Sequence, residues 1–510
     1  MATKVCLVLT EETIEKNLAL LDEYKGYYDI AELRVDLLFS NETFYIRSFP
    51  ELAKVPVILT CRRIVDGGKF KDGEGARMTV LAKALAFLDA DRTKNFAYVD
   101  FESDFNSSTL EEAARAFDIK IIRSLHNLKV PISQITKATE KIRRTDDEIV
   151  KLATVVPTLK DLTALFLQSP NSKSPYIISG LGKYGYLSRI FAQKIGSEIV
   201  YTFSKRYISK NKLQNECIDP ISLHEIYGFN HTSENPKMYA VVGTDVQKSK
   251  SPEIHNKGFQ KWNLPACYVP ISVENFSLAF TFAKKLNIQG LSITSPFKAE
   301  AFSFANMTNK VPEQLHVINT LVNKNSSWVG YNTDVLGFKK ALQEFLTNEE
   351  LSTHSISIIC AGGVAESVCV ALHELLSLPS NTPNNKNKNE HKVCIFNRTK
   401  TKAEQLAKKY NFDFCPLFSP DVHTRLVEFS NSIINCTTVG SIADPKSDPI
   451  PFYHFSGHEK VFDVIYEPEK TKLLQRAKKA GCKIENGYKM LYYQAIEQFK
   501  LFTGKEYGVL

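Results

Sequence analysis

The chain has 510 residues, of which 43% are hydrophobic and 24% are charged. This length exceeds what one hydrophobic core usually serves, so we expect about two to four structural units. No stretch approaches the roughly 20 apolar residues of a membrane span. The formal charge is +8, but the lysines alternate with acids and form no basic block interleaved with aromatics. Nucleic acid is therefore not an expected partner, whereas small anionic substrates and a phosphorylated cofactor suit the charge.

The first residues and the cysteines indicate a cytoplasmic protein. The stretch Met1-Ala-Thr-Lys-Val-Cys-Leu-Val-Leu-Thr10 is too short for a signal peptide and predicts a first strand. The ten cysteines lack metal-ligand spacing, and several lie in or beside apolar runs: Cys61, Cys360, Cys394 and Cys436. We expect reduced, buried thiols, no disulfide framework and no metal site.

The first 205 residues show strand-like runs separated mostly by helix-like segments. About eight such strands within roughly 200 residues are typical of a closed parallel (β/α)8 barrel. Few polar residues interrupt the runs, as expected for strands covered on both faces. The predicted strands are residues 5–10, 30–38, 55–62, 96–102, 120–126, 148–153, 175–180 and 198–204.

Lys151 lies in the apolar stretch Asp147-Glu-Ile-Val-Lys-Leu-Ala153, which predicts a short buried strand. Such a lysine either extends past the strand end to solvent or belongs to a functional site. The first interpretation holds for most lysines in such a position. In a functional site, desolvation and nearby cations leave part of the amine neutral and nucleophilic.

Charged residues at the ends of the neighbouring strands favour the functional interpretation. Active sites of β/α barrels lie at the C-terminal ends of the strands, so these side chains are expected to converge. Arg189 is predicted to open the helix after the seventh strand. The strand-end residues are Glu32, Arg34, Arg62, Asp100, Glu102, His126 and Lys151.

These residue types suit the elimination of water from a β-hydroxy ketone acid. Lys151 would attack the ketone and form an iminium that withdraws electrons from the neighbouring carbon. His126 would remove a proton from that carbon and protonate the departing hydroxyl, because histidine titrates near neutrality. The arginines would bind a carboxylate and hydroxyls in bidentate fashion. These are Arg34, Arg62 and Arg189.

The first half resembles the type I 3-dehydroquinate dehydratases. In that family the residue matching Lys151 forms a Schiff base and the residue matching His126 is the acid and base. The resemblance implies that Glu32, Arg34, Arg62 and Arg189 hold the substrate. It rests on these motifs, in this order: Glu32-Leu-Arg-Val-Asp36, Thr60-Cys-Arg-Arg63, Asp66-Gly-Gly68, Ser124-Leu-His-Asn127, Ile149-Val-Lys-Leu-Ala153 and Gly185-Tyr-Leu-Ser-Arg189.

Two departures from this family matter. Asp66 stands where members usually have glutamate, and it is one methylene shorter; if this carboxylate orients His126, proton transfer would be slower. The family's Ser-Ala-Pro-Gly-Gln lid is replaced by Tyr207-Ile-Ser-Lys-Asn-Lys-Leu-Gln-Asn215. Whether Ser209 or Gln214 serves in its place stays open.

Two polar segments punctuate the chain. We place the barrel domain at residues 1–230 and a linker at residues 231–237, where polar residues follow one another without periodicity. Residues 380–390, which are rich in asparagine and lysine and lack apolar residues, predict a disordered insertion rather than a boundary.

From Met238 a second series of strands and helices begins, and its later part carries a nucleotide-binding pattern. An apolar strand at residues 355–359 is followed by Cys360-Ala-Gly-Gly-Val364, which opens a helix. Such a turn presents backbone N–H groups to a pyrophosphate. The next strand ends in Asn397-Arg-Thr399 with Lys402 nearby. Arg398 in the place of the usual acid suits a 2′-phosphate and therefore NADP.

The second half resembles shikimate dehydrogenases over residues 238–505. The motifs are Lys248-Ser-Lys-Ser-Pro252, Gly290-Leu-Ser-Ile-Thr-Ser-Pro-Phe-Lys298, Val317-Ile-Asn-Thr320, Tyr331-Asn-Thr-Asp334, Asn435-Cys-Thr-Thr-Val-Gly440, Asp463-Val-Ile-Tyr466 and Gly487-Tyr-Lys-Met-Leu-Tyr-Tyr-Gln494.

This resemblance implies a catalytic pair, Lys298 and Asp334, that moves the proton while hydride passes between NADPH and a ring carbonyl. It implies a substrate lobe at residues 238–335 and 481–510, and an NADP lobe at residues 336–480. The implied substrate-binding residues are Ser249, Ser251, Thr294, Asn319, Asp334, Tyr466 and Gln494. The expected cofactor-binding residues are Ala361, Gly362, Gly363, Val364, Asn397, Arg398, Thr399, Lys402, Val464 and Gly487.

Four positions depart from this second family: Lys248, Val335, Cys360 and Ser441 replace histidine, glycine, glycine and methionine. None removes a reacting group. The bulkier Cys360 is expected to tighten the pyrophosphate turn and weaken NADP binding.

The order of the halves resembles the bifunctional fusions of 3-dehydroquinate dehydratase with shikimate dehydrogenase. The product of the first reaction, 3-dehydroshikimate, is the substrate of the second, which yields shikimate. Two alternatives stay open: a metabolite-sensing regulator that keeps the folds without the chemistry, and an enzyme that oxidises quinate. The sequence does not determine the oligomeric state.

Overall fold

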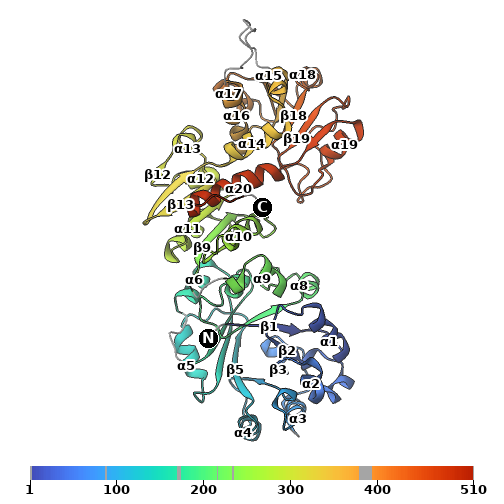
Figure 1. Cartoon of the computed structure of the whole chain (residues 1–510), viewed down its shortest axis with the longest axis vertical. Coiled ribbons are helices and arrows are strands. Elements are labelled where there is room, and N and C mark those ends of the chain that lie inside the picture. The colour runs from blue at the N-terminus through green and yellow to red at the C-terminus, as the bar shows by residue number, and fades with distance from the viewer. Residues whose placement is uncertain are drawn as a thin grey trace. The chain divides into compact units, whose positions relative to one another are not determined.

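In the computed structural model (Figure 1), the described residues are 3–86, 89–168, 174–214, 216–231, 235–377 and 393–508. The insertion predicted at residues 380–390 and part of the predicted linker lie outside them. The chain forms two compact units. Unit 1 contains Met1–Ala240 and Asp245–Ile288, and unit 2 contains Val241–Thr244 and Gln289–Leu510.

Unit 1 is built around a parallel β/α barrel, as the sequence predicts. Its strands follow the order β7-β6-β5-β4-β3-β2-β1-β8. The seam between β7 and β8 is bridged by Glu198 N–H, which donates to Tyr176 O at 2.8 Å. The strands are β1 (Lys4–Leu9), β2 (Ile30–Arg34), β3 (Val57–Thr60), β4 (Tyr98–Glu102), β5 (Lys120–Asn127), β6 (Ile149–Val155), β7 (Tyr176–Leu181) and β8 (Ile199–Phe203).

Apolar side chains on the two faces of these strands form two separate cores, because side chains alternate along a strand. One core packs the strands against the surrounding helices, with Leu7, Leu33 and Leu59 among its members. The other fills the barrel interior, with Cys6, Ile58, Ile122, Ile149 and Tyr201 among its members. Burial on both faces explains the continuous apolar runs in the sequence.

Helices alternate with these strands. They are α1 (Ile14–Glu23), α2 (Phe49–Ala53), α3 (Glu74–Leu85), α4 (Ser108–Ala116), α5 (Ile135–Ile142), α6 (Leu159–Leu167), α7 (Gly185–Ile190), α8 (Lys205–Asn211) and α9 (Pro220–Glu225). One predicted helix boundary and one predicted strand boundary are wrong. Arg189 lies in the last turn of α7 and does not open it, because the helix begins at Gly185.

The strand predicted at residues 30–38 ends at Arg34 and is followed by a 3-10 turn, η1 (Val35–Leu37). The Asp36 carboxylate there accepts backbone N–H bonds from Arg62 at 3.2 Å and Lys69 at 3.0 Å. These bonds hold the chain in a turn where the sequence alone favours a longer strand.

The rest of unit 1 contains η6 (Phe229–His231), the first part of β9 (Lys237–Gly243), α10 (Ser251–Lys261), β10 (Ala266–Ser272) and α11 (Phe276–Lys285), whereas β9 from Val241 on belongs to unit 2. Within this unit the start of α7 bonds to Gln247, Pro270 and Ser272. Tyr184 Oη donates to Ser272 O at 2.9 Å, and Tyr186 Oη accepts from Gln247 Nε2 at 2.9 Å. These bonds fix the segment containing Ser249 and Ser251 near the seventh barrel helix.

Unit 2 contains two groups of elements. The first includes β11 (Gly290–Ile293), α12 (Lys298–Phe302), β12 (Met307–Thr308), α13 (Lys310–Leu315), β13 (Thr320–Lys324), β14 (Ser327–Tyr331), α14 (Asp334–Phe345) and α20 (Tyr488–Thr503). Strand β13 pairs antiparallel with both β11 and β14. Helices α14 and α20 pack closely at Gly337, where an added Cβ would lie 2.8 Å from Gln494 Cβ.

The second group is a parallel sheet in the order β17-β16-β15-β18-β19-β20, the arrangement of a Rossmann-like lobe. Its elements are α15 (Asn348–Thr353), β15 (Ile356–Ile359), α16 (Gly363–Leu376), β16 (Val393–Asn397), α17 (Lys400–Tyr410), β17 (Asp413–Pro416), α18 (Val422–Glu428), β18 (Ser432–Asn435), β19 (Lys460–Asp463), α19 (Lys472–Ala480) and β20 (Lys483–Glu485). The strand order reverses beside β15, where such sheets bind ligands. None of the described helices is long and apolar enough to cross a membrane.

Candidate active sites

A buried charged cluster lies at the C-terminal ends of the barrel strands. Asp100 Oδ2 accepts from Arg62 Nη2 at 2.7 Å and from Lys151 Nζ at 3.1 Å. Glu32 Oε1 lies 3.7 Å from Lys151 Nζ and 3.8 Å from Arg62 Nη2. The sequence predicted this convergence of Glu32, Arg62 and Lys151, and the structure confirms it.

Strand periodicity brings these residues together. On β6, Ile149 lies in the barrel interior, and Lys151, two residues on, has the same orientation. The register pairs Lys151 with Ser124 on β5, and the Ser124 hydroxyl donates to Asp100 Oδ1 at 2.5 Å. On β5 and β6 an apolar inward residue, Ile122 or Ile149, is thus followed two positions on by a polar one, Ser124 or Lys151.

Lys151 does not extend to solvent. It is 5% exposed, and its Nζ lies 3.8 Å from the centre of the Tyr201 ring. Two carboxylates and an aromatic face therefore surround the amine, which matches the functional interpretation rather than the strand-end one. An ammonium group over an aromatic ring gains further electrostatic stabilisation.

His126 contacts Arg62 and is held neutral. Arg62 Nη1 lies 2.9 Å from His126 Nδ1 and also contacts Nε2. Burial lowers the pKa of His126 well below its ordinary value, and the charges of Arg62 and Lys151 lower it further. Since a guanidinium can only donate, it pairs with a neutral imidazole and not with a protonated one. The ring is thus ready to accept a proton.

Asp100 is held as an anion. Burial alone would raise the pKa of its carboxyl, but the charges of Arg62 and Lys151, with the Ser124 hydroxyl, bring that pKa well below its usual range. A carboxylate between two cations keeps both in place in a site with little water. Asp100 was recognised in the sequence as a strand-end residue but was not assigned a role at the site.

Two predicted substrate-binding arginines have other partners in this structure. Arg34 forms a bidentate pair with Asp36, at 2.9 and 2.8 Å. Arg189 donates to four backbone carbonyls, those of Tyr201, Gly180, Gly185 and Glu216. Their roles in binding substrate stay predictions.

The Asp66-Gly-Gly68 turn packs against Arg62. A Cβ on Gly68 would lie 2.1 Å from Arg62 O, so only glycine fits there. The Asp66 carboxylate accepts from Arg63 Nε at 2.7 Å, whereas His126 is in contact with Arg62. Gly68 therefore allows the backbone to pack closely against Arg62. The Asp66 carboxylate is bonded to Arg63 rather than to His126.

A second charged cluster lies in unit 2. Lys298 Nζ donates to Asp334 Oδ2 at 2.6 Å, and Asn319 Nδ2 donates to Asp334 Oδ1 at 2.9 Å. Gln494 Oε1 accepts from Asn319 at 3.3 Å. The two members of the predicted catalytic pair are thus in direct contact, and two predicted substrate residues adjoin them.

Local sequence explains the second cluster. Lys298 and Asp334 are the first residues of α12 and α14, and Asn332 Oδ1 accepts the Asp334 N–H at 3.1 Å. Asn319 also accepts the Thr333 N–H at 2.9 Å through its Oδ1, which fixes the amide orientation.

The structure gives the positions of the remaining predicted substrate residues, but their hydrogen bonds do not test whether they bind substrate. Thr294 follows β11 and its N–H donates to Val242 O at 3.0 Å, while Tyr466 follows β19 and is half-buried. Ser249 and Ser251 lie in unit 1, where Ser249 Oγ accepts the Ser251 N–H at 3.2 Å.

The turn after β15 suits a nucleotide. No atom lies within 4 Å of where a Cβ on Gly363 would be, so the start of α16 is open. At the end of β16, Arg398, Thr399 and Lys402 are exposed. A Cβ on Gly487 would lie 1.9 Å from Val464 O, so glycine alone allows this close approach. These residues fit a dinucleotide with a 2′-phosphate.

Cys360 introduces strain into this turn. Its φ is 124°, a region that residues with a side chain rarely adopt. Its Sγ accepts the Gly362 N–H at 3.3 Å, so one amide of the turn is engaged by sulfur. The predicted obstacle to NADP binding therefore has a backbone component besides side-chain bulk.

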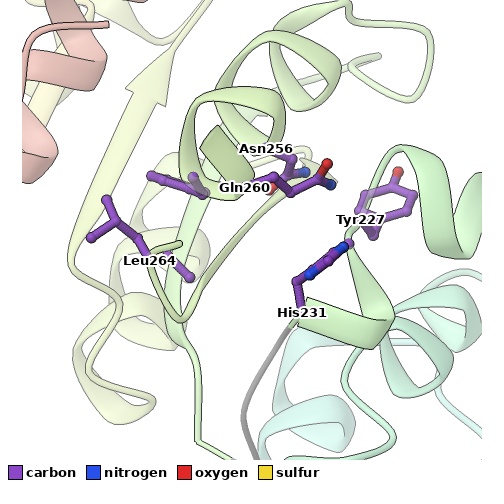
Figure 2. A pocket seen from close by; sticks show the side chains of 8 residues that line it. Tyr227, His231, Asn256, Gln260 and Leu264 are labelled. Atoms are coloured by element: carbon purple, nitrogen blue, oxygen red, sulfur yellow. The ribbon is translucent and has the colours of Figure 1, made fainter. Parts of the chain in front are cut away.

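A small pocket elsewhere in unit 1 carries no catalytic set. Figure 2 shows Tyr227, His231, Asn256, Gln260 and Leu264 around it. Asn256 is already committed to the backbone of Tyr268, donating to its O at 2.8 Å and accepting from its N at 2.7 Å. Within the described ranges, no group of three or more metal-ligating side chains occurs.

Comparisons with known proteins match both halves of the chain to known families. Residues 5–233 match the family model "Type I 3-dehydroquinase", and residues 241–321 match "Shikimate dehydrogenase substrate binding domain". A bifunctional 3-dehydroquinate dehydratase/shikimate dehydrogenase from Arabidopsis thaliana, described as chloroplastic, is 25% identical over 98% of this chain and 82% of its own length.

An NADP-dependent shikimate dehydrogenase from Pyrococcus abyssi is 31% identical over 52% of this chain and 92% of its own length. A solved structure of the dehydroquinate dehydratase and shikimate dehydrogenase of S. pombe covers 99% of this chain and 96% of its own, at 19% identity and a TM-score of 0.42. The chain belongs to the family of bifunctional type I 3-dehydroquinate dehydratase/shikimate dehydrogenases.

Proposed function

We propose that the chain dehydrates 3-dehydroquinate to 3-dehydroshikimate in its barrel and reduces 3-dehydroshikimate to shikimate with NADPH in its second half. The observation that carries this proposal is the presence of two separate reactive sets, buried or half-buried, in one chain. One set holds Lys151 beside Asp100 with His126 near Arg62, and the other pairs Lys298 with Asp334.

In the dehydratase reaction, Lys151 attacks the ring ketone after losing a proton, and water leaves as the imine forms. The iminium draws electrons from the adjacent carbon, from which neutral His126 takes a proton. The protonated His126 then donates to the departing hydroxyl. Hydrolysis of the imine frees the product and restores Lys151. Glu32, Arg34, Arg62 and Arg189 are proposed to orient the ring.

In the dehydrogenase reaction, Lys298 stabilises the negative charge that develops on the carbonyl oxygen and supplies a proton to it. Asp334 orients Lys298 and binds a substrate hydroxyl. A cation at this position acts on charge that is present mainly in the transition state. Ser249, Ser251, Thr294, Asn319, Tyr466 and Gln494 are proposed to bind the hydroxyls and the carboxylate.

The residues of the Rossmann-like lobe fit NADP. Bound there, NADPH supplies the hydride of the second reaction. The pyrophosphate would lie at the glycine turn of residues 360–364, and Arg398, Thr399 and Lys402 would bind the 2′-phosphate, with Asn397, Val464 and Gly487 beside the cofactor. We also propose a cytoplasmic location, supported by ten cysteines that all lie in described positions as free thiols.

The two alternatives from the sequence make different predictions. A regulator without chemistry has no need of a buried lysine held by a carboxylate beside a neutral histidine, so the barrel cluster argues against it. Quinate oxidation would use the same lysine and aspartate pair, so kinetics must separate it from shikimate oxidation.

One coupled assay tests the proposed function. The purified protein receives 3-dehydroquinate and NADPH, and the loss of nicotinamide absorbance is followed. We expect consumption of NADPH with 3-dehydroquinate and with authentic 3-dehydroshikimate, and faster oxidation of shikimate than of quinate in the reverse direction. If NADPH is consumed with 3-dehydroshikimate but not with 3-dehydroquinate, the proposed dehydratase activity is refuted. If neither compound reacts, the alternative of a regulator without catalytic activity is favoured.

A further inference from the structure

Helix α8 lies where the family's lid sequence would follow the last barrel strand. Arg206 forms an ion pair with Glu11 at 2.8 Å, and the Lys205 N–H donates to Tyr24 Oη at 2.8 Å. The Ser204 hydroxyl caps the helix by accepting the Tyr207 N–H at 3.2 Å. Strand β1 ends shortly before Glu11, so these contacts hold α8 beside the mouth of the barrel.

Tyr207 extends an aromatic wall that begins beneath Lys151. Its ring stacks on Phe203, with centroids 5.6 Å apart and an interplanar angle of 16°. Phe203 packs against the barrel-interior core, as does Tyr201 two residues before it, and the Tyr201 ring lies under Lys151 Nζ. The β8 side of the pocket is therefore aromatic from the amine to the mouth.

The Tyr207 side chain ends in a hydroxyl that can donate or accept a hydrogen bond. Its hydroxyl makes no hydrogen bond to any residue that the structure describes. Burial raises the pKa of Tyr207, and the charge of Arg34 opposes that rise, which places the phenol in electrostatic range of a proposed substrate residue. At neutral pH the phenol is protonated and able to donate.

We propose that Tyr207 binds the dehydratase substrate, taking the place of the missing lid residues. Its ring covers the reacting carbon from water, and its hydroxyl donates to an oxygen of the polyhydroxylated ring. This inference rests on the proposed dehydratase function. Ser209 and Gln214, the lid candidates from the sequence, are both exposed, and neither stacks on the aromatic wall.

The test compares Tyr207→Phe and Tyr207→Ala with Tyr45→Phe. Tyr45 is a barrel tyrosine that is 60% exposed, and Arg47, two residues on, donates to Ala86 O and Lys94 O ahead of the N-terminal end of β4, away from the mouth. Loss of one hydrogen bond should raise the KM for 3-dehydroquinate about 3- to 10-fold in Tyr207→Phe with kcat nearly unchanged, because the contact is present in both ground and transition states. Tyr207→Ala should raise KM further and lower kcat, and Tyr45→Phe should match the wild type.

The dehydrogenase activity of each sample reports its folding and should stay constant. An unchanged KM in both Tyr207 variants, or a raised KM in Ser209→Ala in their place, would overturn the inference while leaving the proposed function intact. Absence of dehydratase activity in the wild type would instead refute the proposed function, and this inference with it.

Discussion

The carboxylate of Asp100 lies 3.1 Å from the amine of Lys151 and 2.7 Å from the guanidinium of Arg62. It is the anion shared by the nucleophile and by the cation that contacts His126. Substitution of this residue should therefore disturb both reacting groups at once, although Asp100 itself need not touch the substrate.

Asp100→Asn should lower dehydratase kcat about 100-fold or more, because Lys151 and Arg62 lose a shared anion that fixes their positions. Breaking this buried pair should also destabilise the barrel by about 3–5 kcal/mol. Steady-state kinetics and urea unfolding measure the two effects. Asp22→Asn, at an exposed carboxylate on α1, is the control, and equal activities of the two variants would contradict the role of Asp100.

The lowered pKa of His126 predicts a specific pH dependence. Unfolded histidine takes up a proton near pH 6.5, whereas desolvation and the charges of Arg62 and Lys151 lower the pKa of folded His126 well below that value. As pH falls below about 6.5, the unfolded state thus binds more protons and stability declines until the folded pKa is reached. NMR titration of isotope-labelled histidine should place the His126 pKa below 6.5, and His126→Asn should reduce the loss of stability in acid. A His126 pKa at or above 6.5 would refute the electrostatic account.

The order of elements and the position of Lys151 could be predicted because strand alternation is a local property of the sequence. Period two also brings Glu32, Arg62 and His126 to the same face as Lys151. The Tyr201 ring beneath Lys151 was missed, although counting two residues back from Phe203 points to it. The partners of Arg34 and Arg189 were not predictable, since Asp36 and four backbone carbonyls become available only through turns that long-range hydrogen bonds hold.

Lys298→Met should abolish the charge stabilisation in the second site. We expect a fall of about 100- to 1,000-fold in dehydrogenase kcat, because the cation acts on charge that develops in the transition state. Dehydratase activity should be unaffected. Lys478→Met, at an exposed lysine of α19, is the matched control. A Lys298→Met variant whose dehydrogenase kcat stays within a few-fold of the wild-type value would show that Lys298 is not the proton donor.

Cys360→Gly should strengthen NADP binding. Glycine adopts a φ of 124° without the penalty of about 1–3 kcal/mol that other residues incur, so we also expect a modest gain in stability. Calorimetric titration with NADP and thermal unfolding measure the two effects. Cys360→Ala separates the causes, because it removes the sulfur and keeps a side chain at the strained position. If alanine tightens binding as much as glycine does, backbone strain is not the reason.

The central claim is that Lys151 forms a covalent imine with the substrate, and borohydride reduction tests it most directly. The protein is treated with sodium borohydride in the presence of 3-dehydroquinate, digested and examined by peptide mass spectrometry. We predict that the peptide containing Lys151 gains the mass of the ring, that activity is lost in parallel, and that Lys151→Ala protein gains none. An active wild-type protein that shows no adduct at Lys151, or that is modified at another lysine, would contradict the Schiff-base assignment.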